Sequence, residues 1–445
     1  MLRPGVRRPP AIALVLALAA SAPIACGGGE RADGPLTQEQ AAAAPAVDAP
    51  GCSGVQYRGR GQPRFVIASS LPLQGVLGAE ARQMSRAIDL ALARRDYRAG
   101  RYTVGYQVCD DSTAQAGGST PQRCVANGRA FAAARQVIGV IATMYSTCTA
   151  DLLPVVNRAT DGALAVVSPA NTYVGLTHAG PGAAPGDPRR FYPSRRRNFL
   201  RLAVADDAQG AANAVLAARL GLRRMYALHD GTLYGAGIAA AFARAGRTSG
   251  VTVAGMRKWR SDAEGYTGLA RAIRRARVDG VFVGGQLVNN GARLVADLRA
   301  ALGPRVPLLG SDGMGPPSAL VQRAGRAAEG MTLTKPDIPR RLLTAAGRRF
   351  HDAVRERTGK DPCCYTMHAG QAAEVMLDAI AASDGTRRSV TDRLFRTRVR
   401  GGLLGDFGFD RNGDITLRRI FVHEIRRGEL RFVTAITPAA RLLAG

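Results

Sequence analysis

Phe65-Val-Ile-Ala68 is a short apolar run of the kind that forms a buried β-strand, and residues 84–92 follow it with apolar side chains at helical spacing. The same alternation continues along the chain. Strands separated by helix-length segments predict βαβ units and parallel sheets. The further strands predicted in this way are 102–108, 136–142, 163–167, 225–229, 280–284, 307–310 and 331–333. They form two series, which predict an α/β protein of two doubly wound, Rossmann-like lobes with ligands bound beyond the strand C-termini.

The length of the chain agrees with two lobes. It has 445 residues, of which 46% are hydrophobic. After a leader and a linker, roughly 385 remain to fold, and single hydrophobic cores stop growing at about 250–300 residues. We therefore expect two cores.

The tail of the chain differs from the rest. Asn412-Gly413 stands between β-type runs and is typical of a hairpin turn. Asp410, Asn412 and Asp414 also match the first three ligand positions of a calcium loop. That loop requires Gly at its sixth position and Glu at its twelfth, where this chain has Ile415 and Phe421. The sequence therefore favours the hairpin.

The N-terminus predicts export. Three arginines precede ten apolar residues at 11–20, and small residues then lead to Cys26. This run is about half the ~20 residues that a membrane-spanning helix requires, so residues 1–25 are typical of a signal peptide. Cys26 resembles the acylated cysteine of a bacterial lipobox, although Pro23 stands where that motif usually has Leu. The alternative is an ordinary signal peptide with Cys26 unmodified. Residues 26–60 lack hydrophobic periodicity and predict a flexible, lipid-anchored linker.

The net charge of +27 does not indicate nucleic-acid binding. An exported protein does not meet the chromosome. The basic residues are also scattered along the sequence instead of forming one stripe with interleaved aromatic residues. Only three of the 61 basic residues are lysines, which is typical of a coding preference. We interpret the charge as a solvated surface.

Seven cysteines are present, and lipidation of Cys26 leaves six. In an oxidising compartment six cysteines form up to three disulfides, with 15 possible connectivities. The candidates are Cys52, Cys109, Cys124, Cys148, Cys363 and Cys364. Cys363 and Cys364 with His368 are also a possible soft-metal site, but a structural disulfide is the favoured interpretation.

No motif indicates catalysis, a cofactor or a metal. Gly235-x-Gly237-x-x-Ala240 imitates a dinucleotide fingerprint, but its glycines come five residues after the strand instead of at its end. Walker, G-x-S-x-G and H-E-x-x-H motifs are absent from the sequence. We therefore expect a binding protein with no cofactor, and an exported enzyme is the weakest alternative.

Polar residues gather where the predicted strands end. Hydroxyls and backbone N–H groups suit a carboxylate, and Asp or Glu suits an ammonium, so these strand ends predict a cleft for a small zwitterion. The segments are Cys148-Thr149, Ser168–Thr172, Asp206–Gly210, His229–Gly235, Gly284–Gln286 and Gly310–Gly313.

Five segments in register resemble the type I periplasmic binding proteins, in particular the branched-chain amino-acid substrate-binding family of ABC importers. They begin at Leu71, Cys109, Ser168, His229 and Gly405, and the similarity covers about residues 63–435. The resemblance implies a hinge of three crossings near residues 204, 332 and 418. Lobe I would comprise 61–203 and 333–417, and lobe II 204–332 and 418–445.

The resemblance also implies roles for individual residues. Thr149, Ala170 and Thr172 would bind the ligand's α-carboxylate and α-amine, with Asp206 a further contact near the hinge. Tyr234 would cover the ligand from lobe II, and Asp312 would take the ammonium. Gln286 stands where relatives often have Tyr, Asp312 is shorter than the usual Glu, and the loop after Gly75 lacks an aromatic. The ligand-binding residues expected are thus Thr149, Ala170, Thr172, Asp206, Tyr234, Gln286 and Asp312.

The same resemblance implies a disulfide at Cys148, with Cys124 the first choice of partner and Cys109 the second. It implies a monomer that captures an amino acid or related solute and docks on a membrane ABC permease. A receptor of the same fold that feeds a membrane signalling protein is the alternative.

Overall fold

The computed structural model describes residues 46–443. The predicted signal peptide, Cys26 and the first part of the predicted linker lie outside these residues. Within the described part, no helix is long and apolar enough to cross a bilayer.

The first sheet has the strand order β2-β3-β1-β6-β7-β8. From β3 to β8 the neighbours run parallel, and β2 is antiparallel to β3. Every residue of β1 is buried, as its apolar run predicts. The strands are β1 (Phe65–Leu71), β2 (Arg98–Ala99), β3 (Tyr102–Asp110), β6 (Val137–Ala142), β7 (Ala165–Ser168) and β8 (Phe199–Arg201).

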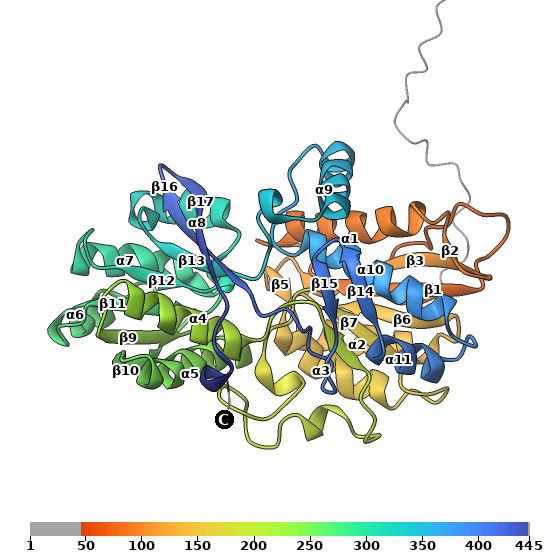
Figure 1. Ribbon diagram of the computed structural model, residues 1–445, viewed down its shortest axis with the longest axis horizontal. Coiled ribbons are helices and arrows are strands. Elements are labelled where there is room, and N and C mark those ends of the chain that lie inside the picture. The colour runs from red at the N-terminus through yellow and green to blue at the C-terminus, as the bar shows by residue number, and fades with distance from the viewer. Residues whose placement is uncertain (1–45, 444–445) are drawn as a thin grey trace, which may run out of the picture. The chain divides into compact units, whose positions relative to one another are not determined.

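Helices from both ends of the chain cover this sheet. In Figure 1, α10 and α11 (blue) lie beside the orange strands and α1, so the C-terminal half of the chain returns to complete the first lobe. Helices α2 and α3 pack together against the sheet. The bounds are α1 (Gly78–Ala93), α2 (Pro121–Ala133), α3 (Ser146–Asn157), α9 (Ala345–Thr358), α10 (Thr366–Ala381) and α11 (Arg387–Phe395).

The second sheet has the order β10-β9-β11-β12-β13-β16-β17. Its first five strands are parallel, and β16 and β17 form an antiparallel hairpin at the edge. In both sheets the parallel strands follow the doubly wound order 2-1-3-4-5, which places a ligand crevice at the strand C-termini. The strands are β9 (Arg224–His229), β10 (Thr252–Lys258), β11 (Gly280–Gly284), β12 (Leu308–Gly310), β13 (Thr332–Lys335), β16 (Ile420–Arg426) and β17 (Glu429–Ile436).

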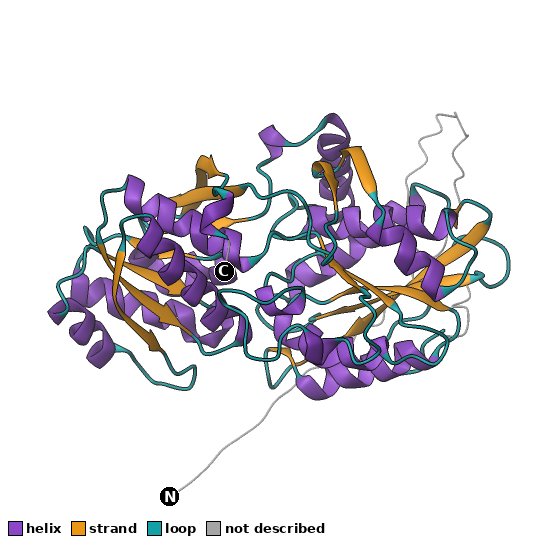
Figure 2. Ribbon diagram, turned by 60° about the horizontal axis from the view of Figure 1, so that its bottom comes forward, coloured by secondary structure: helices purple, strands orange, loops and turns teal. Residues whose placement is uncertain are grey.

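Figure 2 shows helices on both faces of each sheet, as parallel sheets require. In the second lobe α4 packs on α5, and α7 contacts both α6 and α8. The bounds are α4 (Asp206–Arg219), α5 (Leu233–Thr248), α6 (Thr267–Arg275), α7 (Ala292–Leu302) and α8 (Pro317–Ala324). The two-lobed α/β fold predicted from the sequence is thus confirmed.

Two short ribbons complete the described part, β4 (Ser112–Thr113) with β5 (Gly118–Ser119), and β14 (Arg398–Gly402) with β15 (Gly405–Gly408). Beyond β15, Phe409 pairs antiparallel with Ile415 around the turn at Asn412-Gly413. Oδ1 of Asp410 accepts the backbone N–H groups of Asn412 and Asp414 at 2.8 and 3.0 Å, which fixes this turn.

One expected boundary is wrong by a few residues. We placed the second crossing near 332, with lobe I resuming at 333. Strand β13 instead runs to Lys335 within the second sheet, because it pairs with β12 on one side and β16 on the other. The chain leaves the second sheet after Lys335. Residues 202–205, between β8 and α4, form the first crossing, and residues 416–419, before β16, form the third.

The last part of the predicted linker is also ordered. Within the described residues 46–60, Val47 is buried and bonds Gln107 through its backbone N–H and C=O, both at 3.0 Å. Cys52 forms a disulfide with Cys109 of β3. These contacts attach residues 46–60 to the first lobe, so the expectation of a flexible linker is wrong for this part.

The cysteines form two disulfides among the described residues. Cys124 pairs with Cys148, as the resemblance implied, and Cys109 pairs with Cys52. Cys363 and Cys364 are free thiols. The expected third disulfide is therefore absent from this structure.

Candidate functional site

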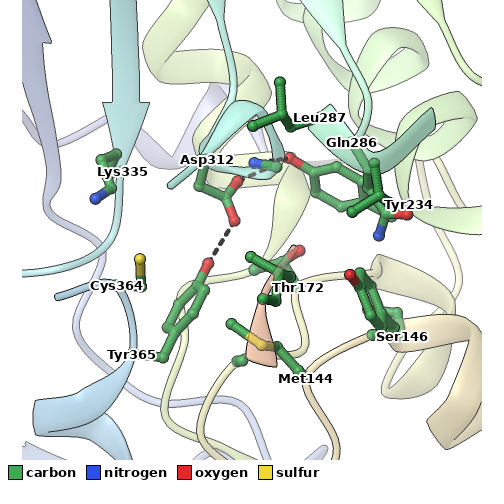
Figure 3. A pocket seen from close by; sticks show the side chains of 16 residues that line it. Met144, Ser146, Thr172, Tyr234, Gln286, Leu287, Asp312, Lys335, Cys364 and Tyr365 are labelled. Atoms are coloured by element: carbon green, nitrogen blue, oxygen red, sulfur yellow. Dashed lines mark hydrogen bonds between the residues drawn. The ribbon is translucent and has the colours of Figure 1, made fainter. Parts of the chain in front are cut away.

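A cavity lies between the ends of the two sheets, lined by loops from both lobes (Figure 3). Its volume of about 60 Å³ is room for about five water molecules, at the 10–15 Å³ that one water requires. In Figure 3, Met144, Ser146, Thr172 and Tyr365 lie on one side, and Tyr234, Gln286 and Asp312 on the other. The cavity therefore suits a small molecule held by both lobes.

On the first lobe, the loop after β7 is fixed by a serine turn. Oγ of Ser168 accepts the backbone N–H groups of Ala170 and Asn171, at 3.2 and 2.9 Å. This turn places Ala170 and Thr172 at the cavity wall. The side chain of Thr172 also interacts with the buried carboxyl of Asp206 behind the cavity.

Helix α3 begins at the same wall with Ser146. Its N-cap residue, Tyr145, makes no capping hydrogen bond with its side chain. The first N–H groups of a helix have no partners within it and carry partial positive charge. The N-terminus of α3 thus presents backbone donors and the Ser146 hydroxyl to the cavity, a setting that favours a carboxylate.

Tyr145 adds a further polar group at this wall. Its hydroxyl is buried and has no hydrogen-bond partner among the described residues, and burial raises the pKa of Tyr145. An unpaired buried hydroxyl is costly, so a ligand atom that bonds it is favoured.

On the second lobe, Asp312 is the principal charged group. Its Oδ1 accepts the hydroxyl of Tyr234 at 2.8 Å, and its Oδ2 accepts that of Tyr365 from the first lobe. Burial raises the pKa of Asp312 despite these bonds. The backbone N–H of Gly313 in turn donates to the Tyr234 hydroxyl at 3.0 Å. This network fixes a carboxyl group opposite the donors of the first lobe.

Asp230 holds the backbone of Gln286 in position through a hydrogen bond. Oδ2 of Asp230 accepts the backbone N–H of Gln286 at 2.9 Å and the side-chain amide of Asn289 at 2.8 Å. Oδ1 accepts both the backbone N–H and the hydroxyl of Thr232, at 3.1 and 2.7 Å. Asp230 thus ties the loop after β9 to the loop after β11. It does not line the cavity.

Of the seven expected site residues, the structure brings five together: Ala170, Thr172, Tyr234, Gln286 and Asp312 line the cavity, and Thr149 and Asp206 do not. Thr149 is completely buried, and its hydroxyl bonds Thr143 at 3.0 Å and the amide oxygen of Asn171. Ser146, one helical turn earlier, occupies the place expected for Thr149. Thr149 supports the loop that carries Thr172.

Asp206 lies behind the cavity, at the first crossing. Its backbone N–H donates to the carbonyl of Thr172 at 2.8 Å. Both carboxylate oxygens are buried without a hydrogen-bond partner among the described residues, and burial and the nearby Asp312 raise the pKa of Asp206 well above its usual value. A carboxyl group in this setting favours its neutral form.

The strand-end argument missed several lining residues. Lys335, at the end of β13, is buried with its ammonium 3.0 Å from Asp337, and Cys364 lies beside it in Figure 3. The apolar residues of the wall are Leu77, Met144, Leu287 and Val288. Only the position of Lys335 at a strand end was a usable signal in the sequence.

The two lobes also contact each other near the cavity. A Cβ on Gly237 of α5 would lie 2.9 Å from the carbonyl oxygen of Gly182 and 3.2 Å from the ring of Tyr173. This glycine therefore permits close approach of the lobes, which accounts for the fingerprint-like glycines without a nucleotide. Among residues 46–443, no group of three or more His, Cys, Asp or Glu side chains is arranged to hold a metal ion.

Known proteins with similar sequences and folds are binding proteins. "Leu/Ile/Val-binding protein homolog 2" of Brucella abortus (strain 2308) is 24% identical over 387 residues, covering 85% of this chain and 95% of the relative. A leucine-binding protein from Thermotoga maritima superposes with a TM-score of 0.71 at 22% identity, covering 84% of this chain and 99% of that one. A solute-binding protein of an ABC transporter from R. palustris, in complex with benzoate, superposes with a TM-score of 0.69 at 15% identity. The match covers 84% of this chain and 97% of that one. These structural similarities show the fold.

The family model described as "Periplasmic binding protein" matches residues 65–429, most of the chain. The match includes both sheets up to the start of β17 and every residue that lines the cavity. The chain therefore belongs to the periplasmic binding protein family and is an extracytoplasmic binding protein, not an enzyme.

Proposed function

We propose that this protein captures a free α-amino acid between its lobes and delivers it to an ABC permease. The observation that carries the proposal is the opposition of Asp312 to the N-terminus of α3 across one small cavity. An α-amino acid carries an ammonium and a carboxylate on neighbouring atoms. Asp312 would bind the ammonium, and Ser146, Thr172 and the free N–H groups of α3 would bind the carboxylate.

The apolar residues indicate where the side chain of the ligand would lie. Leu77 of the first lobe and Val288 of the second both pack against the cluster of Tyr145 and the Cys124–Cys148 disulfide. Met144 and Leu287 add further apolar surface to the cavity. Such a subsite suits an aliphatic side chain, and the names of the Brucella and Thermotoga relatives support this choice.

An aromatic carboxylate is the second candidate, because the R. palustris structure holds benzoate. The unpaired hydroxyl of Tyr145 would suit a carboxylate oxygen of such a ligand. Benzoate has no ammonium, however, and would leave Asp312 without a cationic partner. Asp312 therefore favours the amino acid over the aromatic acid.

Capture proceeds by closure of the lobes around the ligand without covalent chemistry. The Tyr365–Asp312 hydrogen bond spans the two lobes, so a ligand that keeps Asp312 ionised strengthens it. We infer that the closed form is the one that docks on the permease. We also propose that Cys26 is acylated, which would hold the protein at the membrane. Metabolic labelling with a fatty acid, in wild type and in Cys26→Ser, tests that point.

Isothermal titration calorimetry with the standard amino acids and with benzoate tests the function. The proposal expects heat of binding with an aliphatic amino acid, lost in Asp312→Asn. Mass spectrometry of protein purified without denaturant then identifies the ligand it carries. Binding of benzoate but of no amino acid would establish the second candidate.

A further inference from the structure

Cys363 and Cys364 are the two cysteines of the described part that remain as thiols. They are adjacent in sequence, and both are partly exposed. Cys364 lines the ligand cavity, and Figure 3 shows its sulfur directed toward Lys335. A hydrogen bond with Cys363, together with burial, raises the pKa of the Cys364 thiol. Among the described residues, Cys363 is thus the one free thiol available to pair with Cys364 at the wall of the site.

The backbone of this pair is held from both sides. The N–H of Cys363 donates to Oε1 of Gln83 at 3.1 Å, and its carbonyl accepts the backbone N–H and the hydroxyl of Thr366, at 3.1 and 2.8 Å. Cys364 has a φ of +56°, a conformation that L-residues seldom adopt. The surrounding structure thus fixes an unusual backbone conformation at these two adjacent thiols.

The other four described cysteines are paired, which fits folding under oxidising conditions. The bonds Cys52–Cys109 and Cys124–Cys148 join segments distant in sequence, as structural disulfides of exported proteins do. In the same compartment two neighbouring thiols are substrates for oxidation.

We propose that Cys363 and Cys364 interconvert between a thiol pair and a vicinal disulfide, and so form a redox-dependent wall of the ligand site. The oxidant is a small-molecule disulfide. One cysteine thiolate attacks it and releases one small thiol, leaving a mixed disulfide on the protein. The second cysteine attacks the protein sulfur of that bond, which forms the Cys363–Cys364 bond and releases the second small thiol. The two cysteines lose two electrons and two protons, and the small disulfide gains them.

The disulfide is reversible because it is strained. A bond between adjacent cysteines closes a small ring that contains their peptide bond, and the resistance of that peptide bond to twisting strains the ring. Strained disulfides have higher reduction potentials than relaxed ones and are reduced first. A mild reductant should therefore open this bond before the Cys124–Cys148 disulfide, whose Cα atoms are 5.3 Å apart.

Closing the bond changes the site through Tyr365. This residue follows Cys364 directly, and its hydroxyl bonds Asp312 of the opposite lobe in the structure with free thiols. Formation of the Cys363–Cys364 bond draws the Cys364 sulfur toward Cys363 and shifts the backbone that carries Tyr365. Because the Tyr365–Asp312 bond belongs to the reduced geometry, the oxidised form loses it. Ligand affinity then falls by about tenfold, the effect of losing one hydrogen bond to a charged group. This last step rests on the proposed function.

The test starts with exported full-length protein, treated with oxidised glutathione or with a low concentration of dithiothreitol. Thiols are alkylated with iodoacetamide, and the peptide that contains residues 363–364 is analysed by mass spectrometry. We expect two alkylated cysteines after mild reduction. After oxidation we expect none, with a mass lower by two hydrogens and no attached glutathione. Free thiols after oxidation, or a stable glutathione adduct, would overturn the proposal.

Two further measurements test the link to the site. Without ligand, oxidation should lower the melting temperature of wild type more than that of Tyr365→Phe, which already lacks the bond to Asp312. An equal shift in both proteins would overturn the link to Tyr365. Calorimetry with L-leucine should show about tenfold weaker binding to the oxidised form, a difference absent in Cys363→Ser. Equal affinity in both forms would overturn redox control. If no amino acid binds either form, the proposed function fails, and thiol mapping and melting still decide the redox proposal.

Discussion

The hydroxyl of Tyr365, at the start of α10 in the first lobe, donates a hydrogen bond to Oδ2 of Asp312, which follows β12 in the second. The same carboxyl accepts Tyr234 through its other oxygen. Asp312 is thus both the charged group of the cavity and a link between the lobes. Ligand recognition and lobe closure depend on one side chain.

Tyr365→Phe should weaken ligand binding about tenfold, because a hydrogen bond to a charged group contributes about 1.5–3 kcal/mol. Calorimetry measures the effect. Tyr192→Phe is the matched control. It removes a buried hydrogen bond of 2.6 Å to the carbonyl of Leu176, away from the cavity. It should lower stability by about 1 kcal/mol and leave affinity unchanged. Equal loss of affinity in both variants would contradict a specific role for Tyr365.

Affinity for an amino acid should fall as the pH is lowered, and Asp312 is the cause. Burial raises the pKa of this carboxyl, so it takes up a proton at a higher pH than an exposed aspartate. Protonation removes the charge that binds the ammonium. Affinity is therefore full above the raised pKa and is lost as the pH falls through it. Titrations between pH 4 and 8 should show this dependence in wild type, and the weak residual binding of Asp312→Asn should lack it.

Substitution of Ser146 should affect mainly ligand affinity, whereas substitution of Thr149 should affect mainly stability. Ser146→Ala removes a hydroxyl at the cavity wall and should weaken ligand binding by severalfold with little change in stability. Thr149→Val leaves Asn171 without its hydroxyl partner, so it should lower the free energy of unfolding by about 1–3 kcal/mol. Calorimetry and urea unfolding of each variant separate these effects. If Thr149→Val abolished binding in a protein of unchanged stability, the original assignment of Thr149 would be correct.

His178 should make stability depend on pH. Burial opposes its charge, but hydrogen bonds to Asp207 and Asp414 raise the pKa of His178 to about 9. A raised pKa stabilises the fold below the unfolded value of about 6.5, and this contribution is lost as the pH rises through 9. Urea unfolding of wild type should therefore show a decline of about 2–3 kcal/mol between pH 6.5 and 9. His178→Gln should flatten this decline, and an unchanged decline would contradict the assignment.

At low pH, Asp414, which bonds His178, should also make stability depend on pH. Burial opposes its charge, but Arg201 and His178 lower the pKa of Asp414 below its usual value. Arg201 is fully buried and donates to Asp414 at 2.5 Å and to Tyr173 and Thr177 at 2.7 and 2.6 Å. The contribution of Asp414 is present above the unfolded pKa of about 4 and is lost as the pH falls further. The neutral variant Asp414→Asn should reduce the acid sensitivity of urea unfolding and lower stability at pH 7.

The parallel strands could be predicted from the sequence because each is a buried apolar run with a polar residue at its end. This pattern also predicted several of the residues that line the cavity, including Tyr234 and Asp312, since strand ends meet at one edge of a doubly wound sheet. Thr149 was misplaced by one helical turn. Apolar periodicity shows that a helix follows β6, but it does not show that the helix begins at Ser146 and turns Thr149 inward.

Other features depended on contacts that no local pattern encodes. Residues 46–60 have the composition of a linker. Their attachment to the first lobe depends on the Cys52–Cys109 disulfide, which joins residues 57 positions apart, and on the hydrogen bond from Val47 to Gln107. Lys335 could not be assigned to the second lobe without knowing that β13 pairs with β16. The pairing of the other four described cysteines is a property of the fold, and among the described residues it leaves Cys363 and Cys364 with only each other as disulfide partners.

The central claim is that Asp312 recognises the ammonium of an amino acid. Calorimetry with L-leucine and with 4-methylpentanoate, its analogue without the amino group, tests it most directly. The account predicts that wild type binds L-leucine at least a hundredfold more tightly than the analogue, since a buried carboxylate without a cationic partner is costly. It also predicts that Asp312→Asn removes most of this difference. Equal binding of both compounds to wild type, or full discrimination in Asp312→Asn, would contradict it.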